Sequence, residues 1–180
     1  MQRRESRTAQ IAELGVLTAA ALIIFVIENQ IPSPVPIPGV KLGLANIITV
    51  YAVYHYKWSD ALLLVLVRVI LGSVFAGTMI SFAFSISGAL LCLAGMIPLS
   101  KLIGEKYIWL SSVMGAVLHN AGQTAAAIAV MRTTAVIGYL PYLMISGCIA
   151  GAFTGLAAQL VTMRLSSDRK KGEKSSNDDA

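Results

Sequence analysis

Few polar side chains interrupt the long apolar stretches of this sequence, and those few are of types that bind ligands. Arg68 lies near the middle of one such stretch, where an arginine costs about 2.5–3.5 kcal/mol on membrane-insertion scales. It therefore needs an acidic partner, a hydrated cavity or an anionic ligand. Further along, the run Leu118-His-Asn-Ala-Gly-Gln123 spaces His119 and Gln123 by four residues and Asn120 and Gln123 by three. On a helix these three side chains share about one face.

A second group of polar residues brackets a proline-rich segment. Glu28 closes the first apolar stretch, and Lys41 and Asn46 open the second. Between them proline occupies positions 32, 34, 36 and 38, which excludes helix and predicts a stiff, extended loop. Glu28, Lys41 and Asn46 are therefore expected at the same end of the molecule.

Two interpretations of these polar residues remain open. In the structural one, Glu28 pairs with Lys41, Arg68 bonds backbone carbonyls, and Asn120 and Gln123 hold helices together. In the functional one, the residues form a polar site between the helices that opens outward under the proline-rich loop. Their origin in four different stretches favours the functional interpretation.

Other chemistry finds little support in the sequence. A zinc site at His119 lacks partners, because the only other histidine, His55, belongs to a polar break at the opposite side. Cys92 and Cys148 lie inside apolar runs and are expected to be inert small residues rather than a disulfide or a metal pair. No glycine-rich phosphate loop with a lysine is present, so ATP hydrolysis by this chain is excluded. We expect no metal and no cofactor.

The composition predicts an integral membrane protein. Hydrophobic residues make up 56% and charged residues 13% of 180, with a mean hydropathy of +0.73, whereas soluble domains carry roughly 25% charged residues. Apolar stretches of about twenty residues match the ~30 Å hydrocarbon core. We predict an all-α bundle of six transmembrane helices, at about residues 11–28, 42–56, 61–76, 79–99, 107–131 and 141–163.

Three regions follow from this pattern: a basic segment at residues 1–10, the helical membrane domain at 11–163, and a polar tail at 164–180 that is expected to be disordered. A cleavable signal peptide at the start is disfavoured by Glu13 within the first turn. The first stretch also ends in Glu28-Asn-Gln30 rather than in a small-residue cleavage site.

Basic residues predict the orientation. With six spans, eleven Lys and Arg residues fall on one side and only Lys41 and Arg132 on the other. The positive-inside rule then places both termini in the cytoplasm of a cell-membrane protein. The net charge of +5 is explained by this topology and by anionic lipid, not by nucleic-acid binding.

Small residues recur at helical spacing in two stretches. Gly147, Gly151 and Gly155 follow one another every four residues, a pattern that allows close helix approach, here attributed to packing within the bundle. Ala12, Gly15 and Ala19 form a similar row in the first stretch. That row serves either internal packing or docking of another membrane protein.

Several segments resemble a known family. The runs Pro38-Gly-Val-Lys-Leu-Gly-Leu-Ala-Asn-Ile47, Leu66-Val-Arg-Val-Ile-Leu-Gly72, Leu118–Gln123 and Tyr139-Leu-Pro141 look like the Gx transporter family, whose members are often labelled heptaprenyl diphosphate synthase component I. That family is similar in turn to the substrate-binding S components of energy-coupling factor (ECF) transporters.

The resemblance implies a six-helix S-component-like fold with an outward-facing site. It further implies partner membrane and ATPase subunits that supply the energy for uptake. It implies Ala12, Gly15 and Ala19 as the docking row. The site residues that it implies are Lys41, Asn46, Arg68, His119, Asn120 and Gln123, to which the residues themselves add Glu28.

Three function classes stay open. The first is an S-component-like subunit that binds a small, anionic molecule for uptake; the second is a non-catalytic membrane component of heptaprenyl diphosphate synthase; the third is a structural membrane subunit of a redox complex. Catalysis by this chain alone is disfavoured, because prenyl diphosphate synthesis needs aspartate-rich motifs to hold magnesium. The only adjacent aspartates here are Asp178 and Asp179, in the tail.

Overall fold

The computed structural model describes residues 7–30, 45–76 and 79–178, with side chains described as far as residue 164 except at 29, 76, 80 and 81. All regular structure in these ranges is helical, as predicted. The α-helices are α1 (Arg7–Gln30), α2 (Asn46–His55), α3 (Trp58–Ala76), α4 (Met79–Ile103), α5 (Ile108–Met131) and α6 (Leu140–Asp178), with short 3-10 turns η1 (Glu105–Tyr107) and η2 (Ala135–Tyr139).

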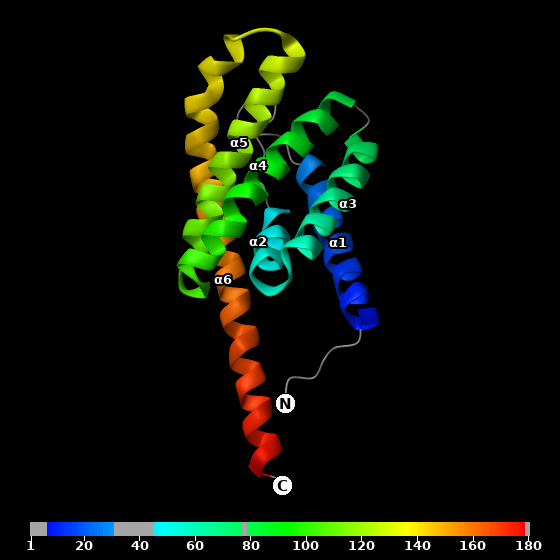
Figure 1. Ribbon diagram of the computed structural model, residues 1–180, viewed down its shortest axis with the longest axis vertical. Coiled ribbons are helices and arrows are strands. Elements are labelled where there is room, and N and C mark those ends of the chain that lie inside the picture. The colour runs from blue at the N-terminus through cyan, green and yellow to red at the C-terminus, as the bar shows by residue number, and fades with distance from the viewer. Residues whose placement is uncertain (1–6, 31–44, 77–78, 179–180) are drawn as a thin grey trace.

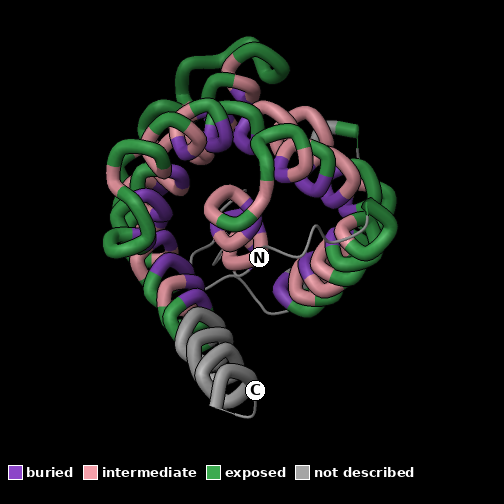
Figure 2. The backbone as a smooth tube through the Cα atoms, turned by 60° about the horizontal axis from the view of Figure 1, so that its bottom comes forward, coloured by how far each residue is buried: buried purple, intermediate pink, exposed green. Residues whose placement is uncertain are grey.

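Five helices form an arc around the sixth. Following the packing of neighbours, the order is α1, α3, α4, α5, α6, while the short helix α2 packs against α1, α3, α4 and α6. Seen towards the end of the bundle, buried residues line the inside of the arc and exposed residues its outside, as Figure 2 shows. The exposed outer residues are largely apolar, for example Val16, Val74 and Phe153 at 70%, 73% and 62% exposure. Such a surface is suited to lipid.

Helix lengths agree with a membrane bundle but fall short of six spans. Five helices are long and apolar enough to cross a membrane, judged by length and composition. The remaining one, α2, has ten residues, about 15 Å at 1.5 Å per residue, or half of a ~30 Å hydrocarbon core. Residues 42–44 of the predicted second span, together with the proline-rich segment and Lys41, lie outside the described residues.

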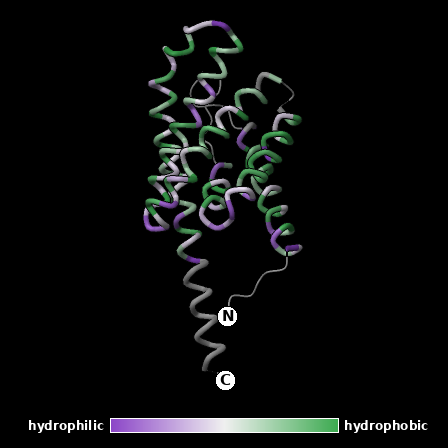
Figure 3. Tube along the Cα trace, viewed as in Figure 1, coloured by the Kyte–Doolittle hydropathy of each residue, from purple (hydrophilic) through white to green (hydrophobic). Residues whose placement is uncertain are grey.

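The start of α1 and the end of α6 lie at the same end of the molecule (Figure 1), which we call the end that carries the termini. Helices α1 and α3 run in the same direction, and their first turns are joined by a hydrogen bond of 2.9 Å from Gln10 Nε2 to Asp60 Oδ2. Helix α2 runs antiparallel to both and ends next to the start of α3. Hydrophilic residues gather at the two ends of the bundle in Figure 3.

Helix ends are set by local backbone chemistry. Gly104 has φ of 67°, in the left-handed region that favours glycine, and it separates α4 from η1. Helix α4 continues past the predicted end at residue 99 to Ile103 and includes Pro98, whose missing N–H leaves one intrahelical hydrogen bond unmade. Pro141 occupies the first turn of α6, where its fixed φ suits a helix start.

Helix α6 extends beyond the predicted membrane domain, through residues 164–178. This segment contains no proline, which would end a helix, so a helix that has already formed can extend through it.

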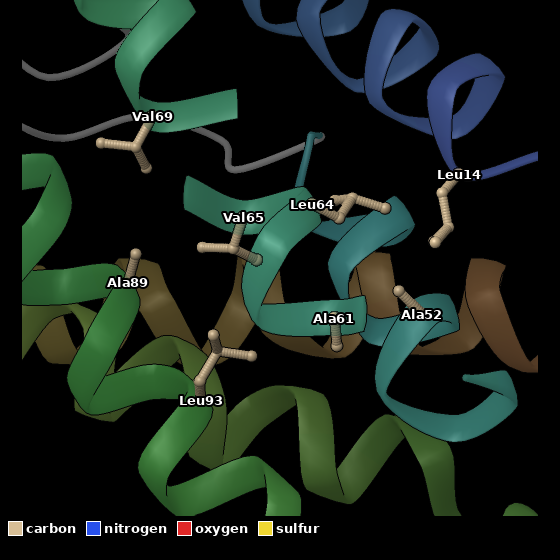
Figure 4. Close-up of a cluster of buried hydrophobic side chains, with 8 residues drawn as sticks. All are labelled: Leu14, Ala52, Ala61, Leu64, Val65, Val69, Ala89 and Leu93. Carbon is tan, nitrogen blue, oxygen red and sulfur yellow. The ribbon is translucent and has the colours of Figure 1, made fainter. Parts of the chain in front are cut away.

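A buried apolar cluster joins the first four helices. It contains Leu14, Ala52, Ala61, Leu64, Val65, Val69, Ala89 and Leu93, which point toward one another in Figure 4. The small side chains of Ala52 on α2 and Ala61 on α3 let these two helices lie close together between α1 and α4. The cluster thereby holds α2 in the centre of the arc, next to the site described below.

Candidate functional site

A cavity of about 430 Å³ lies between the helices, and all six contribute to its wall. Ligand pockets in proteins span roughly 300–1,000 Å³. The lining residues come from the last turns of α1 and α3, the first turns of α2 and α6, the middle of α4 and the length of α5. Along α5 the lining runs from Ser112 to Met131. We call this space the substrate cavity, after the function that we propose below.

The polar wall of the substrate cavity contains six of the seven residues predicted from the sequence. The seventh, Lys41, lies outside the described residues. The polar lining residues are Glu28, Asn46, Thr49, Arg68, Ser73, Ser85, Ser112, His119, Asn120, Gln123, Thr124 and Thr154.

Arg68 is held at the depth where α2 begins. The link between α2 and α3 is short, and Asn46 and Arg68 each lie about ten residues from it along antiparallel helices. They meet there, and Arg68 Nη1 donates a hydrogen bond of 3.3 Å to Asn46 Oδ1. Arg68 is 9% exposed and Glu28 7%, and the Glu28 carboxylate acts electrostatically on the guanidinium. A buried acid and a buried base thus line one cavity.

Helix α5 contributes the opposite polar wall. Asn120 Nδ2 donates a hydrogen bond of 2.6 Å to the carbonyl oxygen of Leu143 on α6, so this amide group also serves as the structural interpretation expected, joining two helices. The Gln123 side chain and the His119 ring lie against Gly88 on α4. His119, Asn120 and Gln123 therefore line the cavity while filling the spaces between α4, α5 and α6.

The hydroxyl groups of the cavity were not predicted from the sequence. Ser112 Oγ and Thr154 Oγ1 lie 3.2 Å apart and join α5 to α6. Thr49 Oγ1 is buried and has no hydrogen-bond partner within the described part of the chain. No local signal distinguishes these residues, because Ser and Thr in helices commonly bond the carbonyl one turn back, as Thr18 and Thr124 do here.

The row of small residues on α1 faces away from the bundle. Ala12, Gly15 and Ala19 are exposed, and a Cβ added at Gly15 would meet nothing within 4 Å. Gly151 and Gly155 behave differently: a Cβ at either would come within 2.8 Å of backbone atoms of α5. The glycine row on α6 therefore serves internal packing, as expected, whereas the α1 row is open.

Comparison with protein families gives one match, whereas curated proteins and solved structures give none. The family model described as Heptaprenyl diphosphate synthase component I matches residues 17–161. This range covers α2 to α5 completely, most of α1 and α6, and every residue that lines the substrate cavity. The chain belongs to the heptaprenyl diphosphate synthase component I family.

Proposed function

We propose that this chain is the substrate-binding subunit of an uptake system for a small anionic molecule, similar to an ECF S component. The observation that carries the proposal is Arg68. It is a buried cation in the wall of a ligand-sized cavity, where it donates a hydrogen bond to the neutral Asn46 side chain. An anionic ligand that accepts further hydrogen bonds from the guanidinium group would offset the cost of burial.

The distribution of basic residues and the position of the cavity support uptake from outside. Most basic residues of the described chain outside the helix interiors lie at the end that carries the termini, including Lys57, Lys101 and Lys106, whereas Arg132 lies at the other. Under the positive-inside rule the termini are cytoplasmic. The substrate cavity then reaches the outer side of the membrane, where Met131 and Val136 line it. The open row on α1 would dock the membrane subunit that, with its ATPase, supplies energy.

The orientation has a direct test. Single cysteines at Ser33 and Thr133, in a Cys92→Ser, Cys148→Ser background, are expected to react with an impermeant thiol reagent in intact cells. Cysteines at Ser59, Ser100 and Ser175 are expected to react only after permeabilisation. If the cysteine at position 100 reacts in intact cells, either the orientation is the reverse of the proposed one or the number of spans is smaller.

A second candidate function is suggested by the family description, which names a component of a synthase. In that case the chain is a non-catalytic membrane component that assists a separate prenyl diphosphate synthase. The described residues hold no group of three or more His, Cys, Asp or Glu side chains suited to a metal ion. Such groups would be needed to hold magnesium against a diphosphate.

Binding and catalysis can be measured on the purified chain. Native mass spectrometry of the protein in detergent is expected to show one small molecule retained per chain. Incubation with magnesium, isopentenyl diphosphate and an allylic diphosphate is expected to yield no longer prenyl product. Chain elongation by this protein alone would disprove the binding function and make the chain an enzyme.

A further inference from the structure

A second hollow lies at the opposite end of α2 from the substrate cavity. It has a volume of about 390 Å³ and is lined by residues of α2, by the first residues of α3 and by the last turns of α4. This end of the bundle also carries the termini (Figure 1). We call this hollow the inner cleft; its polar residues are Tyr54, Tyr56, Lys57, Trp58, Ser100 and Lys101.

The wall between the two hollows is thin and apolar. Val50 and Met96, each 1% exposed, line the substrate cavity. Tyr54, one turn further along α2, and Ile97, the next residue of α4, line the inner cleft. One helical turn rises ~5.4 Å, so about one layer of side chains separates the hollows. We call Val50 and Met96 the partition.

The inner cleft has the charge of an anion site. Lys57 and Lys101 both line it, whereas Lys106, at the same end of the bundle, does not. Lys57 directly precedes the N-terminus of α3, where a positive charge opposes the helix dipole. The positive-inside rule accounts for basic residues at this end of the bundle, but Lys106 satisfies that rule without lining the cleft. The sign of the charge is the same as that of Arg68 in the substrate cavity.

Unsatisfied hydroxyl groups lie beside the partition. Tyr54 packs against the cluster that contains Val50 and Met96. A second hydroxyl group, that of Ser111 on α5, belongs to a residue with 0% exposure. Both are buried without a partner in the described part of the chain, which is rare for polar atoms. A ligand or water that crosses the partition would find bonding groups there.

We propose that the inner cleft is a second site for the same small anion that the substrate cavity binds, reached when the partition opens. This rests on the proposed uptake function: the anion is held first near Arg68 and then near Lys57 and Lys101, from which it leaves to the cytoplasm. The partition opens when the side chains of Val50 on α2 and Met96 on α4 move apart, while α5 and α6 stay together because their glycines bring the two backbones into close contact.

The anion preference of the cleft is tested with charged thiol reagents. Val53 lines the cleft, and a Val53→Cys protein that lacks the native cysteines provides the reporter in inside-out vesicles. The rate ratio of an anionic to a cationic methanethiosulfonate is expected to fall at least about tenfold when Lys57→Gln and Lys101→Gln are combined. Lys106→Gln is the matched control and should leave the ratio nearly unchanged. An equal fall in the control would show a general surface potential and reject the site.

The connection through the partition has its own test. Cys92 lines the substrate cavity, and in a Cys148→Ser protein it reports entry of the anionic reagent from the cytoplasmic face. Val50→Ala is expected to speed this reaction at least about tenfold, because removing two methyl groups opens the wall. Val65→Ala removes the same atoms from a buried residue of α3 that itself lines neither hollow and should have no effect.

A second reporter guards against an unreactive Cys92. Thr49→Cys, in a protein without native cysteines, places a thiol on α2 in the substrate cavity. Unchanged rates at both reporters in Val50→Ala would overturn the proposed route. Neither experiment needs the natural ligand. If mutation of Arg68 abolishes ligand binding but neither labelling experiment shows the expected change, the second site in the inner cleft is rejected. The proposed uptake function is then still supported.

Discussion

Replacing Arg68 by lysine is expected to weaken ligand binding by about 1.5–3 kcal/mol, the range for a charged hydrogen bond. The change keeps the charge but removes the planar fork that holds a carboxylate or phosphate through two bonds. The bond to Asn46 is long at 3.3 Å, so its loss should alter the melting temperature of the empty protein little. Isothermal titration with the ligand identified by mass spectrometry gives the binding change, and thermal melting gives the stability.

Arg68→Leu separates a binding role from a scaffold role. If the arginine binds the ligand, Arg68→Leu abolishes binding and leaves the empty protein at least as stable, because a buried charge is removed. If the arginine is scaffold, the Glu28 carboxylate, itself 7% exposed, loses its counter-charge and the empty protein melts much earlier. Arg68→Leu combined with Glu28→Gln is the control, since it restores stability only in the scaffold case. A large stability loss that the second change repairs would contradict the binding role.

Gly155→Ala is expected to destabilise the protein by about 1–3 kcal/mol, the usual cost of overpacking. In an open helix position the same change adds stability, up to about 1 kcal/mol. At residue 155 the added Cβ would lie 2.5 Å from Trp109 Cα and 3.0 Å from the Trp109 carbonyl oxygen. Backbone atoms cannot rotate away as a side chain can, so α5 and α6 must separate. Thermal unfolding in detergent measures the loss.

Gly15→Ala is the matched control for that experiment. The substitution is identical, the position is again a glycine within a long apolar helix, and a new Cβ meets nothing within 4 Å. Its melting temperature should stay unchanged or rise. A loss at residue 15 as large as that at residue 155 would mean that glycine itself, rather than the close approach of α5 to α6, is what these helices require.

The long helices could be predicted from the sequence because hydropathy is a local property. Residues 107–131 were expected as one span and form α5, Ile108–Met131. Pro141 marked the start of α6, and the glycine row marked its contact with α5. A helix that must satisfy its backbone bonds within the bilayer leaves few alternatives, so apolar length and chain breaks suffice to place it.

The candidate residues could be predicted for a related reason. A charged or amide side chain within an apolar stretch is costly unless it is used. Because of this cost, the sequence alone identifies Arg68, His119, Asn120 and Gln123 as candidates. Their convergence on one cavity follows from burial, since polar groups in a membrane helix turn toward the bundle interior.

The position of α2 was decided only by the tertiary structure. The sequence predicts a second span over residues 42–56, and the described helix, Asn46–His55, sits inside the arc of the other five. Asn46 thereby comes level with Arg68, a contact across 22 residues of sequence. The hydrophobic pattern of the sequence does not predict such a contact, because the contact depends on how deep in the bundle α2 begins.

What the sequence by itself determined is therefore a helical membrane bundle with a handful of costly polar residues inside it. The tertiary structure alone decided that Thr49, Ser112 and Thr154 share a wall with them, and that Val50 and Met96 divide that wall from a second, basic hollow. Hydroxyls and small apolar side chains occur throughout membrane helices at little cost. The role of each such side chain depends on the residues that it packs against. Those residues belong to distant segments of the chain, so a single segment of sequence does not reveal the role.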